Sequence, residues 1–455
     1  MEPPPLRYLA LLVTVLLTNI ASALPPPIPA FPGAEGFGST TPGGRSGRVI
    51  FVTSLADSGP GSFREACEAN GPRIVLFRVA GTIALRKPII VRNPFLTVAG
   101  QSAPGDGVCL RDDYFGIATH DVVVRYLRSR LGDESAQEQD CIDLLNGAHD
   151  CILDHCSATW SIDECLSTSG NDQNCTIQWC LIGESLNQSK HAKGAHGYGS
   201  LARANGPMSW HHNLWIHNDA RNPRLGDAYD RPPSPTFDVR NNVIYDFGAT
   251  ASGLTQGHFN ANYVANYIRP GPSSTAKTPI HIGNKPADSN ITFFLRDNVF
   301  DGNDALTADN SKFVDAYELA GKPQAKTVDT PFPTAPVVTV PATEAVELVL
   351  ASVGASLPVR DPVDTRLVND VRTRSGHLIN SQKQVGGWPE LRRGALPVDS
   401  DDDGIPDDWE TAHGLNPHSA ADAGAVNTKT GYTAIEEYLN SLVSNRSGLV
   451  GTPAR

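Results

Sequence analysis

Short β-prone runs recur through the middle of the chain. Each run joins apolar residues to one polar or small residue at a similar place, and six can be aligned, at residues 152–157, 176–182, 209–215, 239–245, 263–268 and 295–300. Placing Cys156, Cys180, Asn213, Asn242, Asn266 and Asn298 in register gives steps of 24, 33, 29, 24 and 32 residues. Repeats of this length, with no helical pattern between the strands, predict a parallel β-helix.

The repeat also predicts how the coils are held and where a site lies. The aligned asparagines are expected to stack as a hydrogen-bonded ladder inside one turn, coil after coil. Because the steps are uneven, loops of different length leave one side of the solenoid, where such loops can form a binding cleft.

The pattern extends on both sides of this repeat. Further strands are expected at 49–53, 74–79, 89–91 and 96–98, with a short helix over 62–69 that caps the open end. After about residue 320 the residue pattern changes. An extended segment is expected at 328–341, followed by two short amphipathic helices at 342–355 and 362–371.

Composition agrees with strands and turns. Gly (41) and Pro (35) are abundant and Met (2) is scarce, which disfavours a helical bundle. Lys and Arg total 37 against 49 Asp and Glu, a net charge of −12. This charge argues against a nucleic-acid or membrane partner.

The N-terminus predicts export. Arg7, an apolar run over 9–17 and the small-x-small sequence Ala21-Ser22-Ala23 are typical of a secretory signal peptide over residues 1–23. A secreted, extracellular glycoprotein is therefore expected, with four N-x-S/T sequons at Asn174, Asn187, Asn290 and Asn445. The eight cysteines, six of them between Cys141 and Cys180, predict disulfides of undetermined connectivity.

An acidic loop near the C-terminus predicts a calcium site. Residues 399–410 read DSDDDGIPDDWE. The residues at EF-hand loop positions 1, 3, 5, 6, 9 and 12 are Asp399, Asp401, Asp403, Gly404, Asp407 and Glu410. The competing interpretation is a merely solvated acidic turn.

A basic strip lies in the middle of this acidic chain. Between residues 185 and 225 there is one acid, Asp219, and five basic residues, Lys190, Lys193, Arg203, Arg221 and Arg224. Just upstream are the acids Asp140, Asp143, Asp154, Asp163 and Glu164. This arrangement suggests an anionic ligand bound partly through calcium bridges.

These segments resemble secreted pectate lyases of polysaccharide lyase family 1. The resemblance covers roughly residues 30–320 and extends to about residue 395. It rests on the order and spacing of AFPGAEGFG at 30–38, ILDHCS at 152–157, Lys193 within 191–201, RNPR at 221–224 and the strand at 238–245.

The resemblance implies β-elimination on polygalacturonate, in which Ca²⁺ makes the C5 proton more acidic. By match to the family's Arg-x-Pro motif, Arg221 is the base, although arginine is almost always protonated. The competing role for Arg221 is a carboxylate clamp. Lys193 and Arg224 would bind substrate carboxylates. Gly226 stands where the family often has a second arginine.

The resemblance also implies the calcium ligands of the cleft, Asp140, Asp163 and Glu164. A further carboxylate is common in the family where this chain has Ser167. Asp154 is expected to be structural. His211 and His212, adjacent along a strand, are expected to point to opposite faces, which disfavours zinc. The tryptophans at 160, 179, 210 and 215 are expected to stack or to fill the core.

The expected fold is all-β. It is a right-handed parallel β-helix with short helices at its ends and a small C-terminal EF-hand-like calcium loop module. The expected parts are a signal peptide at 1–23, a catalytic β-helix at 24–325, an extension packed on it at 326–395, and an EF-hand or thrombospondin-3-like module at 396–455. A monomer is expected.

Two other functions stay open. A polygalacturonase-type hydrolase would use paired carboxylates, which Asp140 with Asp143 or Asp163 with Glu164 supply, but Arg221 and Lys193 would then lack a chemical role. The other alternative is a non-catalytic β-helix that binds acidic glycans.

Overall fold

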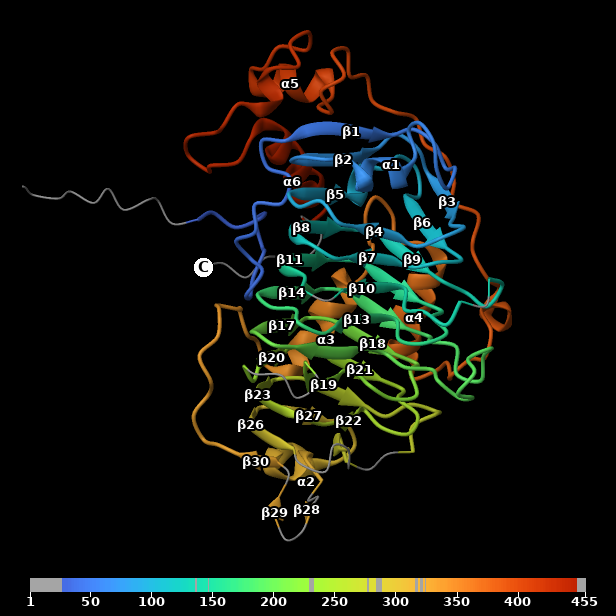
Figure 1. Cartoon of the computed structure of the whole chain (residues 1–455), viewed down its shortest axis with the longest axis vertical. Helices are drawn as coiled ribbons and strands as arrows, with labels where there is room; N and C mark the ends of the chain where they lie inside the picture. The colour runs from blue at the N-terminus through green and yellow to red at the C-terminus, as the bar shows by residue number, and fades with distance from the viewer. Residues whose placement is uncertain are drawn as a thin grey trace, which may run out of the picture.

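Three parallel sheets run along the molecule and form the faces of a β-helix (Figure 1). The structure is a computed structural model. It describes residues 27–447 apart from 136, 146, 229–232, 276–277, 284–288, 316–317, 320–321 and 324. The predicted signal peptide lies outside the described residues. Within these three sheets, each strand pairs in parallel with its equivalents in the neighbouring coils, as Ile152 does with Val123 and Thr176.

The longest sheet has eleven strands. They are β1 (Arg48–Val52), β2 (Arg73–Phe77), β5 (Leu96–Ala99), β8 (His120–Arg125), β11 (His149–Asp154), β14 (Cys175–Gln178), β17 (Met208–His211), β20 (Thr236–Arg240), β23 (His258–Val264), β26 (Asn290–Arg296) and β30 (Ala325–Thr327). The strands expected at 49–53, 74–79 and 96–98 are confirmed as β1, β2 and β5.

The other two faces have nine and six strands. The nine-stranded sheet contains β3 (Gly81–Ala84), β6 (Val108–Arg111), β9 (Arg128–Arg130), β12 (Ser157–Thr159), β15 (Leu181–Gly183), β18 (Leu214–Ile216), β21 (Val243–Tyr245), β24 (Tyr267–Arg269) and β27 (Val299–Phe300). The six-stranded sheet contains β4 (Ile89–Val91), β7 (Phe115–Ile117), β10 (Ile142–Leu144), β13 (Leu166–Ser169), β16 (Leu201–Ala204) and β19 (Arg224–Asp227). Two short pairs complete the strands, β22 (Ser252–Thr255) with β25 (Ile280–Ile282) and β28 (Glu318–Leu319) with β29 (Lys322–Pro323).

A two-residue turn joins the eleven-stranded to the nine-stranded sheet. Its first residue adopts the left-handed conformation in coil after coil, with φ between 50° and 59° at Tyr126, His155, Trp179, His212, Asn241, Ala265 and Asp297. Few non-glycine residues adopt this conformation, so its repetition is part of the fold. Four of these side chains stack, with ring centroids 4.8, 5.7 and 4.3 Å apart along Tyr126, His155, Trp179 and His212.

This turn corrects one sequence prediction. His211 and His212 do not point to opposite faces; their Nδ1 atoms lie 3.0 Å apart. Strand alternation fails here because His212 occupies the left-handed turn, with φ 55°. Among the described residues, neither histidine belongs to a group of three potential metal ligands.

The second residue of the turn forms the expected asparagine ladder. Asn213 Nδ2 donates to Asn242 at 3.0 Å, Asn242 to Asn266 at 2.9 Å, and Asn266 to Asn298 at 2.9 Å. Asn310, which the alignment missed, extends the ladder by accepting from Asn298 at 3.0 Å. Buried amides must be satisfied, so the ladder fixes the register between coils.

The interior of the solenoid is apolar. All eight cysteines are buried free thiols, so the disulfide prediction is not confirmed. They act as small apolar side chains in this core. Trp160, Trp210 and Trp215 are fully buried, as expected. The predicted cap is α1 (Phe63–Glu68), whose first turn is capped by the Ser62 hydroxyl.

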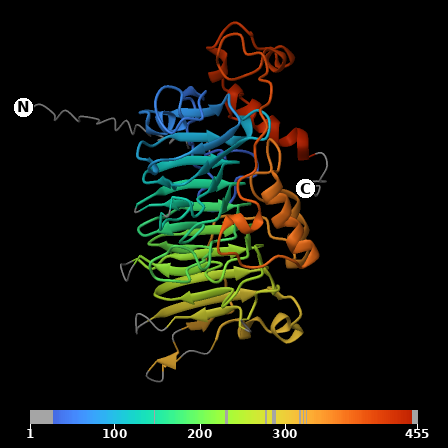
Figure 2. The same ribbon diagram turned by 90° about the vertical axis from the view of Figure 1, so that its right-hand side faces the viewer.

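The remaining helices lie outside the coils. They are α2 (Asp304–Ala308), α3 (Ala342–Ser352), α4 (Pro362–Thr373), α5 (Asp407–His413) and α6 (Ala434–Ser447), with 3₁₀ turns at Gly100–Ser102, Asn310–Phe313, Gln382–Val385 and Asp422–Gly424. The two predicted amphipathic helices are confirmed as α3 and α4, which run along one flank of the stack (Figure 2). In the part of the chain described, no helix is both long and apolar enough to cross a membrane.

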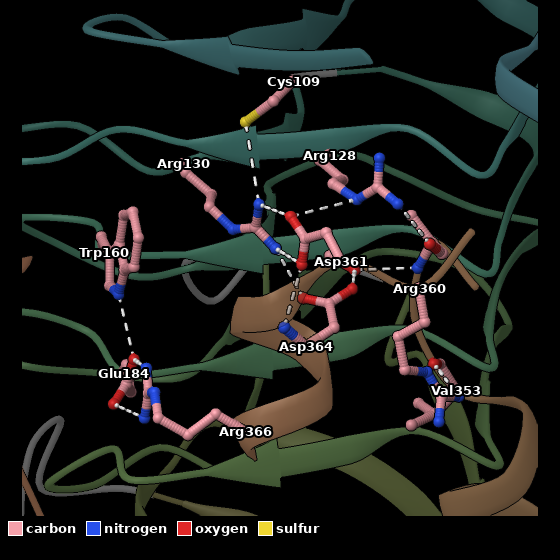
Figure 3. Close-up of polar contacts among 12 residues, drawn as sticks. Cys109, Arg128, Arg130, Trp160, Glu184, Val353, Arg360, Asp361, Asp364 and Arg366 are labelled. Atoms are coloured by element: carbon pink, nitrogen blue, oxygen red, sulfur yellow. Dashed lines mark hydrogen bonds and ion pairs between the residues drawn. The ribbon is translucent and has the colours of Figure 1, made fainter. Parts of the chain in front are cut away.

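Buried ion pairs fasten α4 to the nine-stranded sheet (Figure 3). Arg130 on β9 contacts Asp361 at 2.5 and 3.0 Å and Asp364 at 2.7 Å, and all three side chains are 0% exposed. Alongside, Arg366 contacts both oxygens of Glu184 at 2.7 and 2.6 Å. Charges taken out of water in this way are tolerated only when each is paired.

Arg130→Met is therefore expected to lower the free energy of unfolding by about 3–5 kcal/mol, because it leaves Asp364 buried without its cation and Asp361 with only the longer contact to Arg128, at 3.6 Å. Denaturant unfolding measures the change. Arg392→Met is the matched control, since Arg392 also pairs with an aspartate, Asp106, but is 78% exposed. It should cost at most about 1 kcal/mol. Equal effects of the two variants would contradict this account of the buried cluster.

Candidate active site

The charged residues of the predicted site precede neighbouring strands of the six-stranded sheet. Asp140 comes just before β10, Glu164 just before β13 and Arg221 just before β19. Tyr198, before β16, forms isolated bridges with both Glu164 and Ala220. Parallel register therefore brings residues that are up to 81 positions apart into one row at one edge of the sheet.

Three carboxylates of this row share one small space. Asp140, Asp163 and Glu164 each place an oxygen within 4.8 Å of the other two. Burial, followed by the charges of its acidic neighbours, raises the pKa of Asp140 well above its ordinary value. Burial also raises the pKa of Glu164 to about 7, although Arg221 opposes that shift. These groups repel one another, and a bound cation would relieve the repulsion.

Two histidines hold the third carboxylate. His196 Nε2 lies 2.8 Å from Asp163 Oδ1, and His191 Nε2 lies 3.8 Å from Asp163 Oδ2. The two imidazole rings stack with centroids 4.0 Å apart. Burial tends to raise the pKa of Asp163, but its hydrogen bonds, led by that from His196, keep it below its ordinary value. The two histidines thus orient Asp163 and keep it anionic, as a ligand for a cation must be.

Arg221 lies directly beside this group. Its Nη1 donates to Glu164 Oε1, and its guanidinium lies over the Tyr198 ring, 3.9 Å from the centroid. The side chain is 12% exposed, and Nε is buried without a hydrogen-bond partner. The aromatic face and the carboxylate together fix the guanidinium at the edge of the carboxylate group.

The other predicted substrate contacts lie around this centre. Lys193 is exposed on the loop between the two histidines, and its backbone N–H donates to His191 Nδ1 at 3.0 Å. Arg224 begins β19 opposite Leu201. Gly226 lies on the same strand, opposite Arg203.

Ser167 stands where a further carboxylate was expected, and its hydrogen bond lowers the pKa of Asp140 against the larger effect of burial. Asp154, in contrast, is buried against Arg125, His155 and Gln178, as a structural residue would be.

The donor set of the cleft fits calcium. Carboxylate oxygens are the ligands that Ca²⁺ prefers, at flexible geometry and high coordination number. Asp163 also belongs to a second group with His191 and His196, but imidazole suits transition metals rather than calcium. His191 Nδ1 already accepts a backbone hydrogen bond, so its Nε2 carries the proton when the ring is neutral. These histidines therefore support a carboxylate.

The C-terminal loop forms separate carboxylate groups. Asp399, Asp401 and Asp403 make one, and Asp403 joins Glu410 and Asp422 in another. Asp407 belongs to neither of them; its oxygens accept from the Ser400 backbone and hydroxyl at 2.8 and 2.7 Å. Burial and neighbouring carboxylates raise the pKa of Asp403 to about 6 and that of Glu410 to about 7.

Four of these residues were not predicted from the sequence. His191, His196 and Tyr198 flank Lys193 within the segment HAKGAHGYG, and their recurrence there was the available signal. Asp422 lies twelve residues beyond Glu410, outside any EF-hand spacing, so no local pattern indicates it.

Comparison with known proteins gives concordant names. The chain is 36% identical over 420 residues to a probable pectate lyase C of Emericella nidulans, covering 91% of this chain and 93% of that protein. It is 37% identical over 423 residues to a probable pectate lyase C of Aspergillus terreus, covering 91% and 94%. The fold matches a crystal structure of a Bacillus sp. N165 pectate lyase in complex with trigalacturonate, with a TM-score of 0.51, 15% identity, and 71% and 98% coverage. No family model matches.

Proposed function

This chain belongs to the pectate lyase family and is a polysaccharide lyase, and we propose that it cleaves (1,4)-α-D-galacturonan by calcium-dependent β-elimination to 4,5-unsaturated oligogalacturonides. The observation that carries the proposal is the placement of Arg221 against the buried group of Asp140, Asp163 and Glu164. The related names are those of lyases, and nothing in the comparisons favours the hydrolase or the non-catalytic binding protein.

Asp140, Asp163 and Glu164 would hold the calcium ion of the cleft. When bound, the ion supplies Lewis-acid chemistry by drawing electron density from the uronate carboxylate. His196 and His191 keep Asp163 oriented for this task. Supporting groups of this kind commonly set the affinity of a metal site.

Arg221 is proposed to remove the C5 proton. The proton moves to Arg221 in its neutral guanidine form, and the electron pair of the C5–H bond forms the C4–C5 double bond. The C4–O bond breaks with its electron pair on the oxygen of the leaving sugar, which takes a proton from water. Arg221 must first release its donor contact with Glu164. The Tyr198 ring keeps the guanidinium in place when it does so.

Lys193 and Arg224 are proposed to bind substrate carboxylates on either side of this centre. The exposed position of Lys193 on the loop that carries His191 and His196 suits a group that meets the polymer from solvent. The substrate is the pectate of plant cell walls. The predicted signal peptide at 1–23 and the sequons support a secreted glycoprotein, with the β-helix at 24–325, the extension at 326–395 and a calcium-binding module at 396–455.

An ultraviolet assay tests this function. Each β-elimination creates a C4–C5 double bond conjugated to a carboxylate, whose absorbance rises as polygalacturonate is cleaved. We expect a steady rise at alkaline pH with calcium, loss of at least about 99% of the rate in EDTA because the cleft loses its Lewis acid, and recovery when calcium is restored. A rise that is unaffected by EDTA would contradict calcium dependence.

A further inference from the structure

The C-terminal module contains carboxylates that have no partner. Glu410 is 0% exposed, yet neither of its carboxylate oxygens has a hydrogen-bond partner. Asp403 is 4% exposed and its Oδ2 is unpartnered. Both oxygens of Asp401 and Oδ1 of Asp422 are also buried without partners. Leaving so many anionic oxygens buried without a partner is costly unless a cation neutralises them.

These carboxylates converge from two separate segments. Asp403 and Glu410 belong to the predicted loop, and Asp422 begins the 3₁₀ turn Asp422–Gly424. One oxygen from each lies within 4.8 Å of the others, and Asp403 is shared with Asp399 and Asp401. Asp422 Oδ2 accepts from the Asn416 backbone at 2.9 Å, which fixes the side chain while Oδ1 stays unpartnered. Asp407 lies outside both groups and accepts from Ser400. Asp399 belongs to the first group, although it also accepts from Arg78 and from the backbone N–H groups of Asp403 and Gly404.

The loop lies directly on the first coils of the β-helix. Ile405 is fully buried among Ile74, Leu76 and Ala99 on the outer face of β2 and β5. Gly404 has φ +96°, a left-handed conformation that favours glycine, and a Cβ there would lie 2.5 Å from Leu76 Cδ1, which would have to move. Arg78, which follows β2, contacts Asp399 at 2.8 Å and Asp402 at 2.7 Å.

Other contacts extend this interface along α6. Ile435 and Leu439 belong to the same buried cluster as Ile74 and Leu76. Arg45 contacts Glu436 at 2.8 Å. In Figure 1 the module lies over the β1 end of the stack, where the solenoid begins. The loop that gathers the carboxylates is therefore also part of the docking surface.

We propose that a single calcium ion, bound by Asp399, Asp401, Asp403, Glu410 and Asp422, clamps the C-terminal module onto the first coils of the β-helix. All five ligands are oxygen donors, which suits Ca²⁺ rather than a transition metal. Asp422 takes the place that EF-hand spacing gives to Asp407. The inference rests on the proposed calcium binding of this module, and assigns its ligands and its effect on the fold.

Terbium luminescence and thermal unfolding of the full chain test the ligand assignment. Terbium substitutes for calcium, and Trp409, next to Glu410, can sensitise its emission. Asp422→Asn and Glu410→Gln are expected to weaken calcium competition at this site at least tenfold. Both should lower the apparent melting temperature in calcium by about 3–6 °C, towards that of the wild type in EDTA. Asp408→Asn is the matched control, because Asp408 is exposed and outside both groups.

Each of the other possible results contradicts one named part of the proposals. If Glu410→Gln weakens binding and Asp422→Asn does not, Asp422 is not a ligand and the assignment is wrong. If neither variant differs from Asp408→Asn, the clamp does not exist. A wild-type chain that is stabilised by calcium but cleaves no polygalacturonate would contradict only the proposed lyase function. An active, calcium-dependent lyase without this binding would contradict only the clamp.

Hydrogen exchange tests the effect on the fold. Calcium is expected to raise protection over residues 396–447 and also over β1 and β2, with no change at β23 and β26. Over these same segments, Asp422→Asn in calcium should match the wild type in EDTA. Protection that rises in the module alone would overturn the clamp, because the ion would then order the loop without fastening it to the solenoid.

Discussion

Replacing Arg221 with alanine or lysine is expected to lower kcat on polygalacturonate about a thousandfold, equivalent to ~4 kcal/mol of transition-state stabilisation. The reason is its position: the Arg221 guanidinium lies over the Tyr198 ring, at the edge of the carboxylate group. Lysine keeps the charge but loses the planar group that stacks on the ring. Steady-state kinetics with saturating calcium measures the effect.

The split between kcat and KM separates the two roles of Arg221. If it only clamps a substrate carboxylate, Arg221→Lys should raise KM and leave kcat within a few-fold, and that result would contradict the base assignment. Arg372→Ala is the control, because Arg372 is exposed on α4, away from the cleft. Circular dichroism must show that each variant is folded, since removing Arg221 leaves Glu164 buried without its donor.

Asp140→Asn is expected to raise the calcium concentration needed for half-maximal activity at least about a hundredfold. The change removes one of three negative ligands and keeps the size of the side chain, and a charged oxygen binds Ca²⁺ far more tightly than an amide. Calcium titration of the lyase rate measures it. At a fixed low calcium concentration the variant should be almost inactive, and a large excess of calcium should restore part of the rate.

Asp143→Asn is the matched control for this experiment. Asp143 is three residues further on, but it lies outside the carboxylate groups that could hold a metal, and its two oxygens share the single hydroxyl proton of Ser169, at 2.7 and 2.8 Å. It should change the calcium requirement only a few-fold. Equal losses in both variants would mean that Asp140 acts through the general charge of the cleft, or as one of a catalytic carboxylate pair.

The same site predicts a pH dependence. The pKa of Glu164 is raised to about 7, so below that pH calcium must displace a proton from this carboxylate. The calcium requirement should therefore increase as the pH falls through about 7. A requirement that stays constant across this range would show that Glu164 does not bind the ion.

The β-helix could be predicted because its periodicity is local. The aligned asparagines needed no tertiary information, and the left-handed turn before each of them makes the repeat regular. The prediction that His211 and His212 point to opposite faces was wrong, because it depends on where the strand ends. Alternation holds only within a strand, and the sequence does not mark where β17 gives way to the turn. The disulfides were predicted from compartment alone, whereas the structure has buried free thiols.

Asp140, Glu164 and Arg221 were assigned through the family resemblance. The structure brings them together because each precedes a strand of the same parallel sheet. His191 and His196 lie on a long loop whose path no periodicity defines, and they reach Asp163 only in the folded chain. Asp422 likewise comes close to Glu410 only in the folded chain, through a turn after α5. Arginine–carboxylate contacts such as Arg221 with Glu164 likewise depend on side-chain geometry.

The most direct test of the central claim is digestion of polygalacturonate in water enriched in oxygen-18, with mass spectrometry of the oligosaccharides. Hydrolysis adds one solvent oxygen for every bond cleaved, whereas β-elimination adds none and leaves an unsaturated non-reducing end. The account predicts unsaturated products without solvent oxygen at the newly formed ends when the digest is analysed before reducing ends exchange. Saturated products that carry one heavy oxygen each would contradict it and would return the Asp140, Asp163 and Glu164 carboxylates to acid–base roles.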